Sequence, residues 1–321
     1  MLRKHAPDQE SPIRGDEHVL IKRVLDALGR VILGKPDELV LAMSCMLARG
    51  HLLIEDLPGL GKTTLAQAIA RILGLSFQRI QFTSDLLPAD IAGVSVFDRQ
   101  SSEFRYQPGP VFAQLVLADE VNRATPKAQS ALLEAMEEKQ VSVDGQSHAL
   151  PRPFFVVATQ NPSDQIGTFP LPESQLDRFL MRIELGYPSA RDERELLTGS
   201  DRRELLATID PVVSTSQLEH LQNCVDGMHL SDALLDYIQA LVKFTRESAE
   251  IESGLSPRAA LSLVRAAKAR AFIQQHSGVF PDDVQAVFTS VAGHRLKAAS
   301  NSIYRSANDL CRHVLDSVAI P

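Results

Sequence analysis

The chain has 321 residues, of which 44% are apolar and 23% charged, with no tryptophan and a formal net charge of −7. This is the composition of a globular protein long enough for about two domains. The acidic balance and the scarcity of aromatic residues argue against nucleic acid as a partner, because its binding needs clustered cations or rings on which bases stack.

The first predicted segment is a flexible polar tail over residues 1–15, and no apolar run follows it as it would in a signal peptide. An amphipathic helix comes next, and its apolar face is expected to consist of Val19, Val24, Leu25 and Leu28. Pro36 then opens a second helix. No later apolar run is long enough to cross a bilayer, so membrane insertion is not expected.

Between residues 51 and 188, short apolar strands alternate with helices, which is typical of a parallel sheet built from βαβ units. The strand candidates are residues 51–55, 78–82, 115–118, 154–159 and 181–185. Two stretches interrupt this pattern. Residues 86–110 predict an inserted β-hairpin beside a short helix, and Asp144-Gly145 predicts a tight hairpin over residues 141–150.

After Pro188 the strand signals stop, and helix starts are predicted at Ser189, Ser231, Ser256 and Pro281. The cysteines, which are Cys45, Cys224 and Cys311, lie far apart with no metal-ligand spacing. Each falls in an apolar, helix-like stretch, so we expect free buried thiols and a cytoplasmic protein.

A glycine-rich loop, residues 56–63 (DLPGLGKT), follows the first strand and precedes a helical run. Such a loop wraps phosphates with backbone N–H groups, and the helix N-terminus adds its positive dipole end. Lys62 is expected to reach the β- and γ-phosphates of ATP, and Thr63 to ligate Mg²⁺. The expected nucleotide-binding residues are Pro58, Gly59, Leu60, Gly61, Lys62, Thr63 and Thr64. Asp56 replaces the usual first glycine and is expected to tolerate a positive φ there.

Two carboxylates, Asp119 and Glu120, end the third strand. Beside a phosphate-binding loop, Asp119 can hold magnesium through its water shell, and Glu120 can polarise the attacking water. Asn161 ends the next strand and could sense the γ-phosphate or orient the water, although an asparagine before Pro162 also commonly caps a turn.

Two isolated arginines complete the candidate set: Arg178, in an Asp-Arg-Phe run, and Arg258, in a Ser-Pro-Arg run. Isolated arginines are usually surface salt-bridge partners, so their spacing alone does not assign them to catalysis.

The order of these motifs resembles the AAA+ ATPases, and the flanking sequence is similar to the MoxR family in particular. The resemblance is carried by LIEDLPGLGKT (53–63), IQFTSDLLPADIAG (80–93), DEVNRATPKAQSALLEAMEE (119–138), ATQNP (158–162), PLPESQLDRF (170–179) and SPRA (256–259). It covers nearly the whole chain from about residue 20.

The resemblance implies an α/β fold, with a five-stranded parallel AAA+ core over residues 16–188 and an all-helical lid over residues 189–321. Residues 86–110 would be the helix-2 insert, and residues 141–150 the pre-sensor-1 hairpin.

The resemblance also implies roles for single residues. Asn161 would be sensor 1, Arg178 the arginine finger and Arg258 sensor 2, acting on its own subunit's nucleotide or on a neighbour's. Arg123 would be an interface cation or a salt-bridge partner. The lid sequence His294-Arg295 receives no chemical role.

Family members form rings, usually hexamers, and the resemblance implies Mg²⁺-dependent hydrolysis of ATP to ADP and phosphate. The implied function is a chaperone-like remodeller that works with a von Willebrand factor A domain protein to mature, or insert a metal or cofactor into, a client protein. The alternative is a DNA-acting motor or helicase loader, which the acidic balance disfavours. A transcription activator would carry a GAFTGA loop, which residues 83–110 lack.

Overall fold

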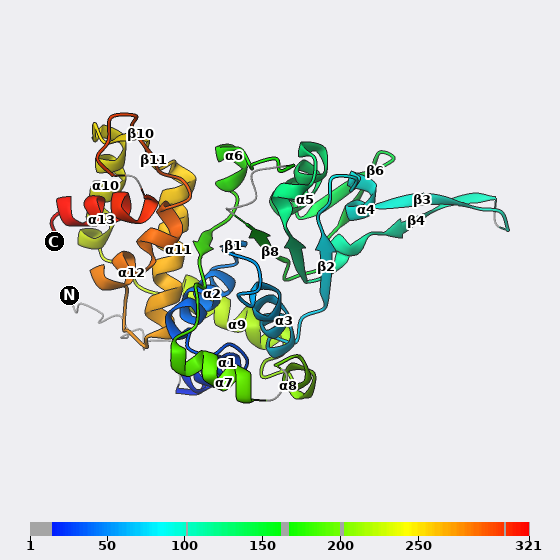
Figure 1. The fold of residues 1–321 in the computed structure, drawn as a ribbon, viewed down its shortest axis with the longest axis horizontal. Helices are drawn as coiled ribbons and strands as arrows, with labels where there is room; N and C mark the ends of the chain where they lie inside the picture. The colour runs from blue at the N-terminus through cyan, green and yellow to red at the C-terminus, as the bar shows by residue number, and fades with distance from the viewer. Residues whose placement is uncertain (1–14, 101, 162–166, 200–201, 305, 321) are drawn as a thin grey trace, which may run out of the picture.

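The computed structural model describes residues 15–100, 102–161, 167–199, 202–304 and 306–320. The predicted tail therefore lies outside the described residues, except for Gly15, which begins the first helix. Figure 1 shows an α/β core from which a long hairpin projects on one side, with a bundle of helices against the other.

Five parallel strands form the central sheet (Figure 1). Their order is β2-β5-β8-β1-β9. The strands are β1 (Leu52–Glu55), β2 (Phe77–Gln81), β5 (Leu115–Asp119), β8 (Phe155–Gln160) and β9 (Met181–Ile183). All five predicted strands are confirmed, with ends that differ by at most two residues. The central strands β5 and β8 are buried on both faces, which explains their continuous apolar sequence.

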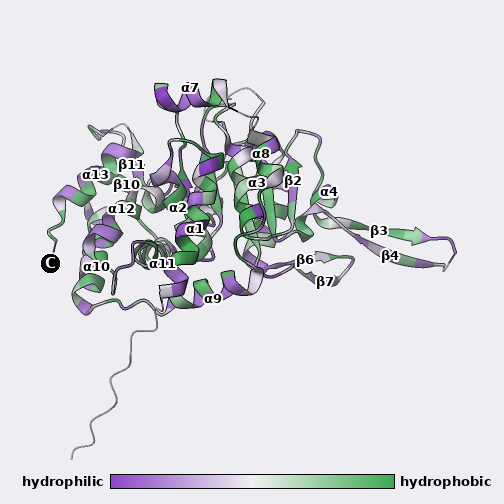
Figure 2. Ribbon diagram, turned by 90° about the horizontal axis from the view of Figure 1, so that it is seen from below, coloured by the Kyte–Doolittle hydropathy of each residue, from purple (hydrophilic) through white to green (hydrophobic). Residues whose placement is uncertain are grey.

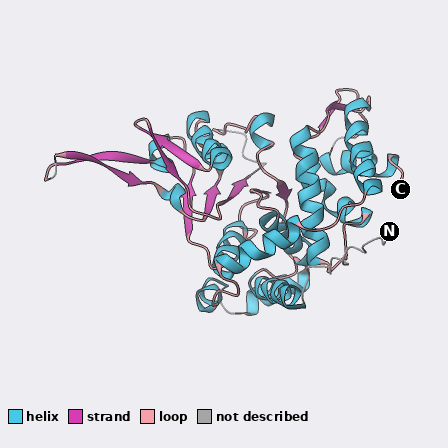
Figure 3. Cartoon of the chain, turned by 180° about the vertical axis from the view of Figure 1, so that it is seen from behind, coloured by secondary structure: helices cyan, strands magenta, loops and turns pink. Residues whose placement is uncertain are grey.

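Helices cover both faces of the sheet (Figure 3), so successive residues of a strand pack into different cores. One face carries α1 (Gly15–Val31), α2 (Pro36–Leu47) and α3 (Lys62–Ile72). Leu115 and Leu117 of β5 belong to that core. Val116 and Ala118 point the other way, into a core shared with α5 (Pro126–Glu138). The sheet is thereby held rigid, and its carboxyl edge carries the candidate site.

The amphipathic helix α1 is confirmed, but its predicted apolar face was partly wrong. Val19 is 60% exposed. The buried residues of the helix are Ile21, Val24, Leu28 and Val31. Val19 precedes Val24 by five residues, which turns it about 140° around the helix axis and out of the buried stripe.

Both predicted insertions are confirmed as hairpins. Their elements are α4 (Pro88–Ala92), β3 (Gly93–Asp98), β4 (Glu103–Pro108), β6 (Gln140–Val143) and β7 (Gln146–Ala149). The β3–β4 hairpin extends clear of the body and carries hydrophobic residues (Figure 2). The β6–β7 hairpin turns at Asp144 and Gly145, whose positive φ values suit a tight two-residue turn.

The C-terminal part is mainly helical, and its predicted helix starts are confirmed. Ser189, Ser231 and Ser256 each cap a helix, because each hydroxyl accepts a hydrogen bond from the N–H three residues later. The helices are α7 (Ala190–Thr198), α8 (Arg202–Thr208), α9 (Thr215–Asp226), α10 (Asp232–Glu247), α11 (Pro257–Ile273), α12 (Pro281–Ala292) and α13 (Ala307–Ser317). One short antiparallel pair, β10 (Ile251–Ser253) with β11 (Lys297–Ala298), corrects the expectation that strands end with the core. These strands are too short to leave a periodic signal in the sequence.

The three cysteines differ in burial. Cys45 and Cys311 are buried free thiols, as predicted, whereas Cys224 on α9 is only half-buried. Within the ranges that the structure describes, no helix is both long enough and apolar enough to cross a membrane.

Candidate nucleotide site

The loop between β1 and α3 has the backbone shape of a phosphate-binding loop. Gly59 and Gly61 have φ values of 84° and 87°, a conformation that side chains other than glycine rarely adopt. No atom lies within 4 Å of a Cβ built on either glycine, so the requirement is conformational rather than steric. Lys62 is the first residue of α3, and its ammonium donates to the carbonyls of Asp56 and Gln160, the second at 3.1 Å. The lysine thus crosses the loop at the carboxyl ends of β1 and β8.

Asp56 differs from the sequence prediction in its backbone conformation. It has no positive φ, so the expectation of a left-handed residue there was wrong. Its Oδ1 instead accepts a hydrogen bond of 2.8 Å from the N–H of Leu57. Its Oδ2 accepts bonds of 2.7 and 2.6 Å from the N–H groups of Leu185 and Gly186, where the chain leaves β9. The carboxylate therefore ties the loop to the segment that leads into the helical part.

Asp119 lies at the tip of β5, with only 7% of its surface exposed. Its Oδ1 accepts a 2.6 Å hydrogen bond from the hydroxyl of Thr159. Its Oδ2 accepts bonds of 2.6 and 3.0 Å from the Arg79 guanidinium. Thr159 and Arg79 cannot be recognised from the sequence alone, because their contact depends on β2 and β8 flanking β5 in the sheet. The result is a fixed pair of hard oxygen atoms, which is what Mg²⁺ prefers.

Glu120 has φ 57° and ψ 49°, a left-handed conformation that is uncommon outside glycine and often found at functional sites. Its N–H donates to Thr159 at 2.9 Å, so one hydroxyl links both acidic residues. Its carboxylate accepts a 2.9 Å bond from Gln81 and forms a 3.2 Å ion pair with Arg123. Arg123 is thus a salt-bridge partner within the chain, and Gln81 is a further residue that only the strand order reveals.

Asn161 follows β8 and is 5% exposed. Since β8 lies between β5 and β1, Asn161 lies between the acidic pair and the glycine loop along the carboxyl edge of the sheet. The N–H of Asp56 donates to the carbonyl of Gln160 at 3.2 Å, which joins the two segments. The suggested turn with Pro162 lies outside the described residues.

A pocket of about 470 Å³, within the usual range for ligand sites, opens beside the loop. Five of the predicted nucleotide residues line it: Pro58, Gly59, Leu60, Gly61 and Thr64. Lys62 and Thr63 are their chain neighbours but do not line this space. Its apolar wall comes from segments that sequence motifs did not indicate, chiefly Val31, Ile32, Tyr187, Leu196 and Leu197. Such a wall can hold the flat, apolar face of a nucleotide base, and the loop can hold its phosphates.

The two candidate arginines meet on one carboxylate away from this pocket. Arg178 binds Oε2 of Glu137 through its Nε at 2.7 Å, and Arg258 binds Oε1 through its Nη2. Glu137 lies in the last turn of α5, and these two guanidinium groups, Arg178 first, hold the pKa of its carboxyl below its ordinary value. Neither arginine lines the pocket. Glu137 is a residue that motif spacing did not indicate.

The helical part also fixes the backbone around Arg178. Arg295, whose side chain is 4% exposed, donates to the Asp177 carboxylate at 2.7 Å. It donates further to the carbonyls of Asp177, Phe179 and Leu180, at 3.1, 2.6 and 3.2 Å. The residue to which the sequence assigned no chemistry therefore binds the chain on both sides of Arg178.

The sheet order, the glycine loop after β1 and the acidic pair after β5, together with the helical part, define a P-loop ATPase of the AAA+ class. Residues 51–181 match the family model described as ATPase family associated with various cellular activities, and residues 243–311 match that of the AAA lid domain.

Similar proteins specify the family of this chain within the AAA+ class. The chain is 41% identical to the uncharacterized protein YeaC of Bacillus subtilis, over 95% of this chain and 96% of that protein. It is 38% identical to Chaperone MoxR1 of Mycobacterium tuberculosis, over 98% and 88% of the two chains. A crystal structure of a Cytophaga hutchinsonii protein assigned as an ATPase superposes with a TM-score of 0.86 at 35% identity, covering 95% of this chain and 96% of that one. The chain belongs to the MoxR family of AAA+ ATPases.

Proposed function

We propose that this chain hydrolyses ATP with Mg²⁺ as one subunit of a ring, most simply a hexamer, and uses the energy to remodel other proteins in the cytoplasm. The observation that supports this most directly is that the residues expected to act on ATP lie in two separate places. The glycine loop, Asp119 and Glu120 lie on one edge of the sheet, whereas Arg178 and Arg258 lie together on Glu137, outside the pocket beside the loop. A ring supplies the missing half of each site from a neighbouring copy.

Within one subunit, the glycine loop and Lys62 bind the phosphates, and Thr63 with Asp119 holds the magnesium ion, which offsets charge on the phosphate oxygens. Glu120 polarises the attacking water, and Asn161 orients it. Gln81 and Arg123 contact the Glu120 carboxylate and fix where it lies at the edge of the sheet.

Arg178 and Arg258 both act on the nucleotide of the neighbour. Their shared carboxylate supports this, because a bond to Glu137 keeps both guanidinium groups on the same side of the subunit. A planar, permanently charged guanidinium suits the charge that spreads over the phosphoryl oxygens in the transition state.

The exposed residues of the β3–β4 hairpin favour a protein, rather than DNA, as the molecule that is remodelled. Its exposed apolar side chains include Phe97 and Phe104, which are 50% and 74% exposed. Its two arginines are offset by two carboxylates, Asp98 and Glu103, so the described ribbon has no cationic face for a phosphate backbone. Exposed apolar patches of this kind mark protein contact sites. The immediate partner is a von Willebrand factor A domain protein, and the client is a protein that receives a metal or cofactor or otherwise matures.

The test is capture of the ATP-bound state. The Glu120→Gln variant should bind ATP and retain it, so it should co-purify with a von Willebrand factor A domain protein when ATP is present. The double variant Lys62→Ala Glu120→Gln is the matched control, because it cannot hold the nucleotide. Enrichment of DNA-bound factors alone, with no protein of the expected class, would instead favour the DNA-acting motor.

A further inference from the structure

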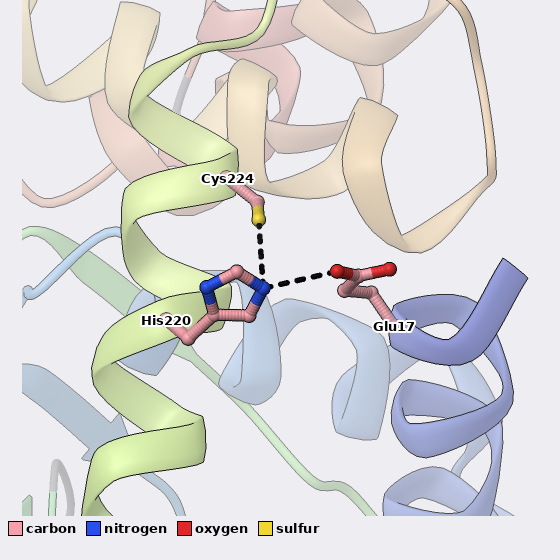
Figure 4. A group of neighbouring side chains, drawn as sticks. All are labelled: Glu17, His220 and Cys224. Carbon is pink, nitrogen blue, oxygen red and sulfur yellow. Dashed lines mark hydrogen bonds and ion pairs between the residues drawn. The ribbon is translucent and has the colours of Figure 1, made fainter. Parts of the chain in front are cut away.

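A carboxylate, an imidazole and a thiol meet where the first turn of α1 lies beside α9 (Figure 4). Nε2 of His220 lies 2.9 Å from Oε1 of Glu17 and 3.7 Å from Sγ of Cys224. The three ligand atoms all lie within 4.8 Å of one another. His220 and Cys224 are four residues apart, so they project from the same face of α9. None of the three residues lines the nucleotide pocket.

Two polar atoms lie close to Nε2, and a single proton on this nitrogen cannot form full hydrogen bonds to both. An imidazole nitrogen carries either one hydrogen or one lone pair, in a single direction in the ring plane. It can therefore bond to the Glu17 carboxylate or to the Cys224 thiol, but not fully to both. A metal cation on that lone pair would be shared by all three side chains.

The observed distances are close to those of a zinc site. Zinc lies about 2.0–2.1 Å from nitrogen and about 2.3 Å from sulfur, so tetrahedral ligands are separated by about 3.6 Å for nitrogen and sulfur, and by about 3.3 Å for nitrogen and oxygen. The corresponding separations here are 3.7 and 2.9 Å, and the Glu17 oxygen and the Cys224 sulfur lie within 4.8 Å of each other. Side-chain shifts of about an ångström or less therefore bring the three atoms to zinc distances.

The donor set also selects the metal. A thiolate and an imidazole suit Zn²⁺ or Co²⁺ and are poor ligands for Mg²⁺ or Ca²⁺, which require oxygen. The site is thus chemically distinct from the magnesium position at Asp119. Its access is open, because the His220 side chain is 61% exposed, whereas Glu17 is held at 12% exposure. Three protein ligands leave the fourth tetrahedral position for water.

We propose that Glu17, His220 and Cys224 form a Zn²⁺ site that joins α1 to α9. The metal links the first described helix of the chain to a helix almost 200 residues further along, and so stabilises the packing between them.

Cobalt titration of the full-length protein, without a histidine tag, tests the site. Co²⁺ should bind at one equivalent and produce the intense visible and near-ultraviolet bands of tetrahedral, thiolate-bound cobalt, and Zn²⁺ should displace it. Zn²⁺ should also slow alkylation of Cys224, which is the accessible thiol of the three. Outer-shell changes weaken metal sites about 10–100-fold, so the loss of a direct ligand in Cys224→Ser or His220→Ala should cost at least that.

Glu17→Gln tests the carboxylate, and Glu219→Gln is its control, since Glu219 is an exposed neighbour of His220 that is not in the cluster. Zn²⁺ should raise the melting temperature of the wild type and of Glu219→Gln, but not that of Cys224→Ser. Octahedral cobalt spectra without a thiolate band, or spectra unchanged in folded Cys224→Ser, would overturn the proposal.

Discussion

The carboxyl edge of the sheet and the arginine cluster on Glu137 are assembled in different ways. The edge is formed by residues that directly follow parallel strands of one sheet: the glycine loop after β1, Asp119 and Glu120 at β5, and Asn161 after β8. The cluster takes one residue each from α5, from the segment before β9 and from α11. The residues named for the first region all belong to the core, whereas the second also needs Arg258 from the helical part docked on the core. Binding and hydrolysis of ATP should therefore be separable by mutation.

The largest effect is expected from Arg178→Ala. Arginine fingers contribute roughly 10³–10⁵ to the hydrolysis rate, so turnover should fall by about that factor. ATP affinity should stay near that of the wild type, because Arg178 does not line the pocket. Steady-state hydrolysis and calorimetric ATP binding measure the two effects.

Mixed assemblies sharpen this test. Subunits of Arg178→Ala and Lys62→Ala, combined from dissociated protein, should regain part of the activity, because one supplies a working pocket and the other an arginine. If verified mixed rings are no more active than either parent, Arg178 does not act across the interface.

Glu120→Gln tests the edge of the sheet in isolation. The amide keeps the size of the side chain and its ability to bond Gln81, but it cannot act as a base, so turnover should fall by about 10²–10⁴-fold while ATP binding persists. Single-turnover hydrolysis measures the loss, with Glu134→Gln, an exposed glutamate of α5, as the control. Retention of most of the activity would show that the general base is another residue.

Glu137→Gln is expected to have a smaller effect, on the cluster alone. Without the carboxylate, the two guanidinium groups repel each other and lose their shared orientation, so kcat should fall by roughly 10–100-fold. KM for ATP should change little, since the pocket is intact. Glu138→Gln is the matched control, because that residue is the exposed neighbour of Glu137. Rescue by Glu137→Asp, without rescue by Glu137→Ala, would support a positioning role. An equal rise of KM in Glu137→Gln would contradict the separation of the two regions.

The last effect is on stability in acid rather than on turnover. His51 lies just before β1, where Nδ1 accepts from the N–H of Val156 at 2.9 Å and Nε2 lies 3.3 Å from the carbonyl of Met136. Burial lowers the pKa of His51 from 6.5 to about 4, so the unfolded chain binds the extra proton first as the pH falls. The stability that the neutral ring contributes is complete above about pH 6.5 and is lost towards pH 4, by roughly 3 kcal/mol.

Urea denaturation at several pH values should therefore show a flatter profile between pH 6.5 and 4 for His51→Gln than for the wild type. The arginine cluster on Glu137 should respond to acid differently. The pKa of Glu137 is lowered, so the contribution of its ion pairs to stability persists until the pH falls below the ordinary carboxyl range. A wild-type stability that is constant down to pH 4 would show that His51 does not titrate as its burial predicts.

The sequence predicted the elements of the edge because each signal is local. Residues 56–63 lie between one strand and one helix, and Asp119 and Glu120 directly follow an apolar run. The same reasoning identified both hairpins and the serine-capped helices. In these places, a few neighbouring residues determine the conformation.

The remaining features depend on contacts between distant segments. Arg79 and Thr159 reach Asp119 only because β2 and β8 flank β5. Glu137 and Arg295 contact the segment around Arg178 across more than 40 and more than 110 residues. No motif spacing encodes such contacts, and the two short strands of the helical part carry too few residues for a pattern.

The carboxylate of Asp56 has a thermodynamic consequence. One side chain accepts hydrogen bonds from the start of the glycine loop and from the first residues after β9, so the loop cannot loosen while the connection to the helices stays fixed. The core and the helices should therefore melt cooperatively, in a single calorimetric transition. ATP should shift that whole transition upward by mass action, instead of stabilising the core alone. An Asp56→Gly chain, which has the more common loop residue, should melt at a lower temperature but still in one transition, because α11 and α12 pack on α2 and β9.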